Sequence, residues 1–152
     1  MIVYLLRHGE AEFHAVKDQD RALTDSGRKQ LHTLCGNRAK DLKDIEHVYH
    51  SPYKRAVQTA HIVCQHFPVA SSVSPSLTPD SAISSALKLI YETSEHNQVA
   101  LFVTHQPLIG SLVSALVDAD EGRYGMGTGS LAAFHCDPPV RDCCELRWLD
   151  HV

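Results

Sequence analysis

Three short segments of this 152-residue chain place arginine or histidine next to an apolar run or a proline. Arg7 and His8 follow the run Ile-Val-Tyr-Leu-Leu, Arg55 comes shortly after a Ser-Pro pair, and His105 comes shortly after Val-Ala-Leu-Phe-Val. An imidazole acts as a base, a metal ligand or a nucleophile, and a guanidinium group binds phosphate or carboxylate. These residue types indicate a site for an anion, with ordinary polar surface positions as the alternative.

The segments that must position these residues alternate between strand and helix. Short apolar runs predict strands, and apolar residues at helical spacing predict helices. The strands are expected at 2–6, 45–50, 69–73, 99–103, 131–136 and 144–149, and the helices at 26–42, 52–66, 80–94 and 107–117. This order predicts an α/β fold, a three-layer α/β/α sandwich with a mostly parallel sheet and a late antiparallel edge strand.

Residues at the expected helix starts support this interpretation. Thr24 or Asp25 is a suitable N-cap for the first helix. Pro52 and Pro107 are expected as the first residues of two others, where a missing N–H costs nothing. The positive N-terminal ends of those two helices would then point to the edge of the sheet.

Parallel strands place all their carboxyl ends at one edge, where α/β sheets bind ligands. We therefore expect Arg7, His8, Arg55 and His105 to meet there and to form a pocket for a multiply charged anion, with phosphate as the obvious candidate. A core position for His105 and a solvated helix position for Arg55 are the alternatives.

Four motifs in order carry a family resemblance. They are Arg-His-Gly-Glu at 7–10, Leu-Thr-x-x-Gly at 23–27, Ser-Pro-x-x-Arg-Ala-x-x-Thr-Ala at 51–60 and Thr-His at 104–105. Together they resemble the histidine phosphatase superfamily, which implies a phosphoglycerate mutase-like fold. The small size and the phrase Arg-Ala-Leu-Thr at 21–24 look most like the SixA-type phosphohistidine phosphatases.

The resemblance implies roles for five residues. His8 would attack phosphorus and become transiently phosphorylated, while Arg7, Arg55 and His105 would hold the phosphoryl oxygens. Arg21 would be a further phosphate contact, although a loop arginine is more often simply exposed. The resemblance implies no metal ion and no cofactor.

The proton donor is where the sequence departs from the wider family. Relatives acting on phosphate esters usually place a carboxylate between the third strand and its helix; here residues 74–80 contain only Asp80, with Glu10 and Asp18 as further candidates. An imidazole, whose conjugate acid has a pKa of about 6.5, leaves without such a donor. The short segment also predicts an open site, suited to a phosphohistidine on a protein such as a phosphocarrier or phosphotransfer domain. A phosphatase or mutase for a small phosphate ester, using Asp80 or Glu10, and a non-catalytic phosphoprotein-binding module are the alternatives.

Size and composition limit the other possibilities. The length predicts a single domain over 1–152, and the net charge of −4 argues against nucleic acid as the main partner. The apolar runs are too short for a membrane span, and no secretion signal precedes the first strand. A monomeric cytoplasmic enzyme is expected.

The remaining motifs are interpreted as structural. The five cysteines, at 35, 64, 136, 143 and 144, show no CxxC spacing and are expected to be reduced; adjacent Cys143 and Cys144 leave metal binding or redox chemistry as a minor alternative. No zinc-type spacing occurs among the eleven histidines. The glycines at 125, 127 and 129 are expected to form a turn before a strand, with Tyr124 and Met126 as candidates for the pocket rim, and Trp148 is expected to pack.

Overall fold

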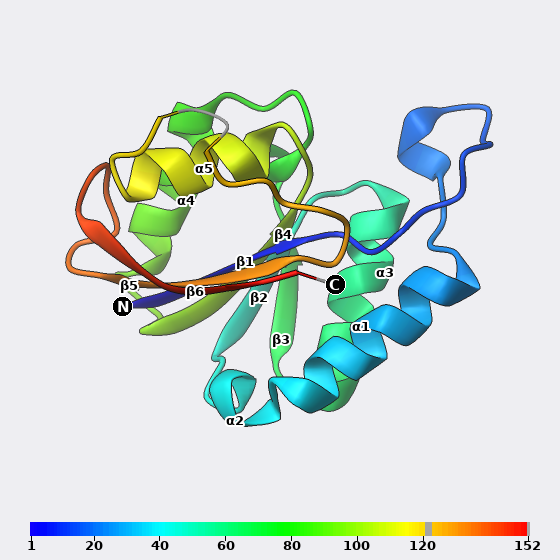
Figure 1. Cartoon of the computed structure of the whole chain (residues 1–152), viewed down its shortest axis with the longest axis horizontal. Helices are drawn as coiled ribbons and strands as arrows, with labels where there is room; N and C mark the ends of the chain where they lie inside the picture. The colour runs from blue at the N-terminus through cyan, green and yellow to red at the C-terminus, as the bar shows by residue number, and fades with distance from the viewer. Residues whose placement is uncertain (121–122, 152) are drawn as a thin grey trace.

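A computed structural model describes residues 1–120 and 123–151 and contains one six-stranded sheet with helices on both faces (Figure 1). The strands are β1 (Ile2–Arg7), β2 (His47–His50), β3 (Ala70–Val73), β4 (Val99–Thr104), β5 (Leu131–Cys136) and β6 (Cys144–Asp150). The helices are α1 (Asp25–Asn37), α2 (Ala39–Leu42), α3 (Lys54–His66), α4 (Ile83–Thr93) and α5 (Leu108–Leu116). Two short 3-10 helices, η1 (Asp18–Asp20) and η2 (Pro75–Leu77), lie in loops.

The strand order β3-β2-β4-β1-β5-β6 confirms the predicted mixed sheet. Strands β3, β2, β4 and β1 are parallel neighbours, whereas β5 pairs antiparallel with β1 and β6 pairs antiparallel with β5. The strand that runs against the others, β5, lies one place in from the edge. Strand β1 is therefore bonded on both sides, and its last residue, Arg7, is in register with Thr104 at the end of β4.

Alternating side chains of the strands fill two cores, because successive residues of a strand point to opposite faces. Tyr4 and Leu6 of β1 pack with α1, α2 and α3, and Val3 and Leu5 pack with α4 and α5. The predicted three-layer architecture is thus confirmed. No helix in the described residues is long and apolar enough to cross a membrane.

Several predicted boundaries were wrong for local reasons. The helix expected over 26–42 is two helices, because Arg38 leaves helical geometry at φ −102° and ψ 15° and turns its guanidinium to Asp150. Pro52 does not begin α3, since the backbone N–H of Tyr53 donates to Ser51 Oγ and forms a turn before Lys54. Pro107 precedes α5 as its N-cap residue rather than being its first residue.

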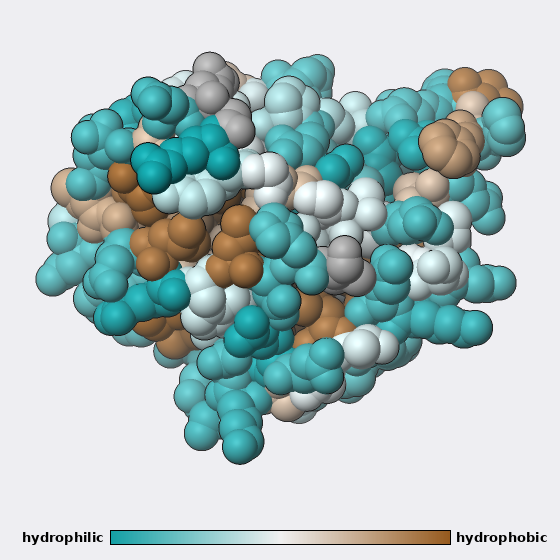
Figure 2. All heavy atoms as spheres, viewed as in Figure 1, coloured by the Kyte–Doolittle hydropathy of each residue, from teal (hydrophilic) through white to brown (hydrophobic). Residues whose placement is uncertain are grey.

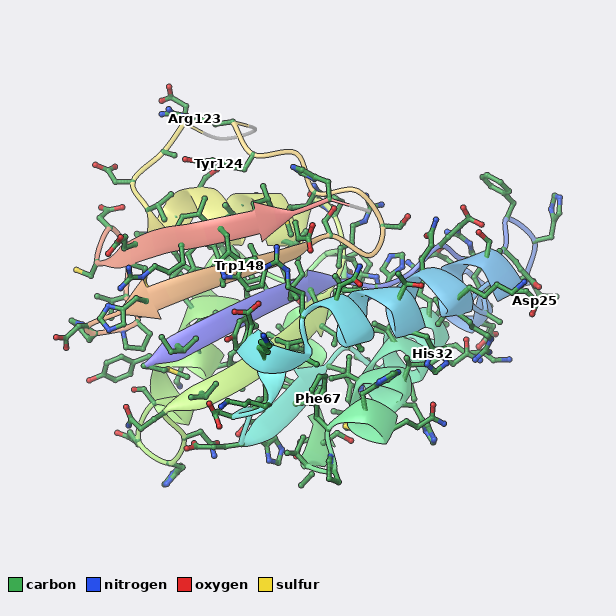
Figure 3. All side chains as sticks on the ribbon, turned by 60° about the horizontal axis from the view of Figure 1, so that its bottom comes forward. Asp25, His32, Phe67, Arg123, Tyr124 and Trp148 are labelled. Carbon is green, nitrogen blue, oxygen red and sulfur yellow. A yellow bond between two sulfur atoms is a disulfide. The ribbon has the colours of Figure 1, made fainter. Side chains whose placement is uncertain are left out.

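The last strand, β6, packs its tryptophan as expected. Trp148 lies on the sheet face that α1 and α2 cover (Figure 3), with its ring 6.1 Å from that of Tyr4 and the Arg38 guanidinium 3.9 Å above it. Arg38 also binds Asp41 and Asp150, so one cation ties the end of α1 to the C-terminal strand.

The expectation of five reduced cysteines was wrong for one pair. Cys136 and Cys144 form a disulfide between β5 and β6. The antiparallel register places the two residues directly opposite each other. They are eight residues apart in the sequence, so a search for CxxC spacing does not detect the pair. Cys35, Cys64 and Cys143 are free thiols.

Candidate active site

The carboxyl ends of β1 and β4 and the first turn of α3 bring four predicted residues together. The ring centroids of His8 and His105 are 4.9 Å apart, and Arg55 Nε donates to His8 Nε2 over 3.2 Å. Arg55 is 4% exposed, which excludes a solvated helix position, and the contact with the His8 ring places His105 in this cluster. Arg7 ends β1 beside them.

The backbone carbonyl of Gly9 determines which nitrogen of His8 is available. His8 Nδ1 lies 2.7 Å from Gly9 O, an acceptor only, so Nδ1 must carry the proton. Nε2 then keeps its lone pair and points at Arg55. A neutral imidazole with its proton fixed on Nδ1 leaves the lone pair of Nε2 available to a base or a nucleophile.

Thr59 on α3 holds the turn after His8, a role that the sequence motifs did not reveal. Gly9 N donates to Thr59 Oγ1 over 3.1 Å, and that hydroxyl donates to Arg55 O over 2.7 Å. A Cβ at Gly9 would lie 2.8 Å from a methyl group of Leu31, so this position accepts only glycine without rearrangement. His8 and the first turn of α3 are therefore positioned relative to each other.

The Leu-Thr-x-x-Gly motif supports the same turn from the other side. Thr24 caps α1 by accepting from Gly27 N over 2.9 Å, and its own N–H donates to Glu10 O over 3.0 Å. A Cβ at Gly27 would collide with Glu10 O, so the glycine lets α1 approach the chain next to the nucleophile. The Glu10 carboxylate accepts from the Thr24 hydroxyl over 2.8 Å.

The glycine-rich segment at 125–129 holds both the guanidinium group and the backbone carbonyl of Arg7. Its NH1 donates to Met126 O over 2.7 Å, while the N–H of Gly129 donates to the carbonyls of Arg7 and His8 over 3.2 and 3.0 Å. The Met126 carbonyl thus contacts Arg7, and Tyr124 is partly buried against the core cluster that contains Met126. Arg7 Nε is buried and has no hydrogen-bond partner among the described residues.

His105 is likewise a buried ring without partners. Neither of its ring nitrogens has a hydrogen-bond partner in the described part of the chain, and the ring of Tyr53 meets it edge-on at 5.1 Å. The guanidinium of Arg55 lies 5.1 Å from the ring of Tyr53. Tyr53 is a second residue that sequence motifs alone did not indicate.

Burial and neighbouring cations keep both histidines neutral. Burial, followed by the charges of Arg55, Arg7 and Arg21, lowers the pKa of His8 from 6.5 to about 4, although the Gly9 carbonyl opposes the change. Burial and the neighbouring His8 lower the pKa of His105 to about 2. A bound phosphoryl dianion would raise both values again, so the site is electrostatically prepared for an anion.

The three candidate acids lie in different places. Asp80 accepts from the Thr78 hydroxyl over 3.0 Å, and Glu10 is bonded to Thr24. Asp18 does reach the site, where it pairs with Arg55 over 3.1 Å and with Arg21 over 3.0 Å. Hydrogen bonds from these arginines lower the pKa of Asp18, so it is a carboxylate at neutral pH and not a proton donor.

The site is more enclosed than the prediction of an open pocket suggested. The segment at 74–80 is bonded to the end of β4, where Thr104 Oγ1 donates to Leu77 O over 2.7 Å, and the loop before α1 brings Asp18 onto Arg55. Arg21 donates to Glu12 O over 2.6 Å as well as to Asp18, so in this structure it binds the loop. Its phosphate-binding role stays a prediction. The described residues contain no group of three or more side chains suited to a metal ion.

Comparisons with known proteins agree with this geometry. The model of the histidine phosphatase superfamily (branch 1) matches residues 3–78. Phosphohistidine phosphatase SixA of Escherichia coli is 39% identical over 121 residues, covering 76% of this chain and 74% of that protein. The SixA homolog of Haemophilus influenzae is 31% identical, covering 76% and 77%. A structure of the protein histidine phosphatase SixA with tungstate superposes with a TM-score of 0.88 at 28% identity, covering 98% of this chain and 96% of that one.

Proposed function

Since the chain belongs to branch 1 of the histidine phosphatase superfamily, we propose that it is a phosphohistidine phosphatase that forms a phosphoenzyme on His8. The observation that carries this proposal is the set of buried, unpartnered donors around a nucleophile with a fixed tautomer. Arg7 Nε and the His105 ring lack partners among the described residues, and His8 Nε2 keeps its lone pair. Buried donors are nearly always satisfied in proteins, so this arrangement points to an anionic ligand.

The first step transfers the phosphoryl group to the enzyme. His8 Nε2 bonds to phosphorus as the bond to the substrate's ring nitrogen breaks, and the electron pair stays with the substrate's imidazole. When the other nitrogen of that ring carries a proton, it leaves as neutral imidazole, so no carboxylic acid is needed. Arg55 Nε, which donates to Nε2 in the free enzyme, turns to a phosphoryl oxygen.

The second step releases inorganic phosphate. Water attacks phosphorus and the bond to His8 Nε2 breaks, with its electron pair returning to the ring; one proton of the water stays on the phosphate and the other passes to the solvent. His8 leaves as a neutral ring because Nδ1 keeps its proton, which Gly9 O accepts throughout. The guanidinium groups of Arg7 and Arg55 neutralise charge on the equatorial oxygens in both steps, and the ring of His105 donates an N–H to one of these oxygens.

The proposed substrate is a protein, such as a phosphocarrier or phosphotransfer domain. The names of the two SixA relatives support a phosphohistidine substrate, from which the histidine imidazole is the leaving group. The ionised state of Asp18 supports a leaving group that needs no acid. We propose that the enzyme acts as a monomeric single domain in the cytoplasm.

The test uses a histidine-phosphorylated carrier protein labelled with ³²P. We expect the wild type to release the label and to hold part of it briefly in acid-labile, alkali-stable form, and His8→Ala to slow release by at least about 1,000-fold. The matched control is His61→Ala, an exposed histidine on α3. Label released equally by His8→Ala would refute the nucleophile, and turnover of small phosphate esters alone would favour the ester phosphatase.

A further inference from the structure

A loop beside the site, residues 12–21, projects from the rest of the molecule, and we call it the arm (Figure 1). Its base is closed by the bridge between Ala11 and Leu23 and by Glu12 N donating to Ala22 O over 2.8 Å. Arg21 adds a bond to Glu12 O. A loop whose ends meet in this way is an Ω-loop, a type that is frequently functional.

Asp18 connects the arm to the candidate active site. Its Oδ2 accepts from Arg55 NH2 over 3.1 Å, its backbone carbonyl accepts from Arg55 NH1 over 2.8 Å, and its Oδ1 accepts from Arg21 NH1 over 3.0 Å. One carboxylate therefore pairs with both arginines. The side chain of Arg55 is 5% exposed, whereas that of Asp18 is 56% exposed, so the contact closes over the site from outside.

This contact competes with the ligand that the arginine is expected to bind. Each of the three guanidinium nitrogens of Arg55 already donates, to His8 Nε2 and to two oxygens of Asp18. A phosphoryl group on His8 needs donors from the same guanidinium. The lowered pKa of Asp18 means that its carboxylate is charged and occupies Arg55 as an anion at neutral pH.

The outer part of the arm exposes apolar side chains. Phe13 is 89% exposed and Val16 is fully exposed, and they are the two most exposed large apolar residues among those described. Figure 2 shows apolar surface on this projecting segment, separate from the rest of the molecule. The arm is joined to His8 through Asp18 and Arg55, so its apolar residues belong to a segment that borders the site a phosphohistidine must reach.

We propose that the arm is the docking surface for the phosphohistidine protein, and that Asp18 holds Arg55 until docking and the incoming phosphoryl group replace its carboxylate. The inference deepens the proposed function and rests on it for the identity of the partner. The docking surface is Phe13 and Val16, and the carboxylate acts as an internal competitor. Small phosphate compounds, which lack a protein surface to pack on Phe13 and Val16, must displace Asp18 unaided.

The competition is tested with inorganic phosphate alone, by calorimetric titration of wild type, Asp18→Asn and Asp20→Asn. Asp20 lies on the same 3-10 helix, is exposed and carries the same charge, so Asp20→Asn controls for the loss of one negative charge. We expect Asp18→Asn to bind phosphate at least 5-fold more tightly than Asp20→Asn. Asp18→Ser should also bind phosphate more tightly than Asp20→Asn. Agreement between the two Asp18 variants attributes the change to the lost carboxylate rather than to local misfolding caused by one substituted side chain.

Equal or weaker phosphate binding by Asp18→Asn would overturn the competition, since a carboxylate that merely orients Arg55 would weaken binding when removed. This titration needs no phosphohistidine protein, so its outcome is independent of whether the proposed substrate is correct.

Docking is tested by comparing a phosphohistidine protein with p-nitrophenyl phosphate as substrates of Phe13→Ser/Val16→Ser. We expect the loss of kcat/KM on the protein to exceed the loss on the small ester by about 10-fold. Val73→Ser, at an exposed valine of β3, is the matched control and should show no such difference. Equal losses on both substrates would contradict docking by the arm, and no turnover of the phosphoprotein by wild type would contradict the proposed function instead.

Discussion

At the scale of single residues, the site depends on a histidine that stays neutral with one nitrogen free. The Gly9 carbonyl holds the proton on Nδ1, and burial beside three arginines opposes a second proton. These two effects act on different atoms of one ring: the first sets its tautomer and the second its charge.

The low pKa of His8 gives a direct spectroscopic prediction. Because burial lowers that pKa to about 4, the ring should remain neutral, with Nδ1 protonated, from pH 7 down to about 5 and should protonate only below that. A ¹⁵N NMR titration of the ring nitrogens, with His8→Gln for assignment, measures this. A midpoint near the ordinary value of 6.5 would contradict it.

Thr59 offers a second prediction at this scale. Thr59→Val keeps the shape but leaves the buried N–H of Gly9 unpaired, so we expect the free energy of unfolding to fall by about 1–3 kcal/mol. We also expect kcat to fall, since the same hydroxyl links Gly9 to Arg55. Thr59→Ser keeps the hydroxyl and should retain most of the activity. Unfolding in urea and steady-state kinetics give both results.

At the scale of elements, the start of α1 matters because it presses against the segment that follows the nucleophile. Gly27→Ala would place a methyl group against the backbone of Glu10, and overpacking of this kind costs about 1–3 kcal/mol. The matched control is Gly36→Ala in the same helix, where no atom lies within 4 Å of the added carbon. That change should stabilise by up to about 1 kcal/mol. Thermal unfolding compares them, and equal shifts would refute the role of Gly27.

Element types and order follow from the sequence, but several element ends do not. Buried strands such as β4 are continuous apolar runs, so their positions are readable from local pattern. The break at Arg38 and the late start of α3 after Pro52 arise from contacts with Asp150 and Ser51. The first of these contacts joins residues that are far apart in the sequence, and the second depends on the geometry of a single turn. The spacing of apolar residues along the chain predicts neither of them.

At the scale of the whole molecule, burying two neutral histidines makes stability depend on pH. The pKa values of His8 and His105 are lowered in the folded state, so the unfolded chain binds more protons as the pH falls below 6.5. The free energy of unfolding should therefore decrease from pH 6.5 toward pH 4, by up to about 1.4 kcal/mol per pH unit for each histidine.

Urea unfolding at pH 7, 6 and 5 measures this dependence in wild type and His105→Gln. Glutamine does not titrate, so the variant should show a shallower decrease whatever its stability at pH 7. Parallel slopes in the two proteins would exclude His105 as a source of the pH dependence.

The gathering of Arg7, His8, Arg55 and His105 could be predicted because a parallel sheet brings its carboxyl ends together. The ion pair between Asp18 and Arg55 could not, since it joins a loop and a helix 37 residues apart and depends on how the loop folds back. The sequence offers Asp18 as a candidate proton donor. In the structure it is instead an ionised carboxylate that pairs with Arg55. The disulfide likewise follows from strand register rather than from spacing.

The closed base of the arm has an evolutionary consequence. Its two ends meet at the bridge between Ala11 and Leu23, and β1, which carries His8, is bonded on both sides. Exchange of residues 13–17, which include neither Asp18 nor Arg21, therefore leaves β1 and the ion pair on Arg55 in place. With the arm as the proposed docking surface, natural variation in these residues would alter the choice of partner without replacing any residue that surrounds His8.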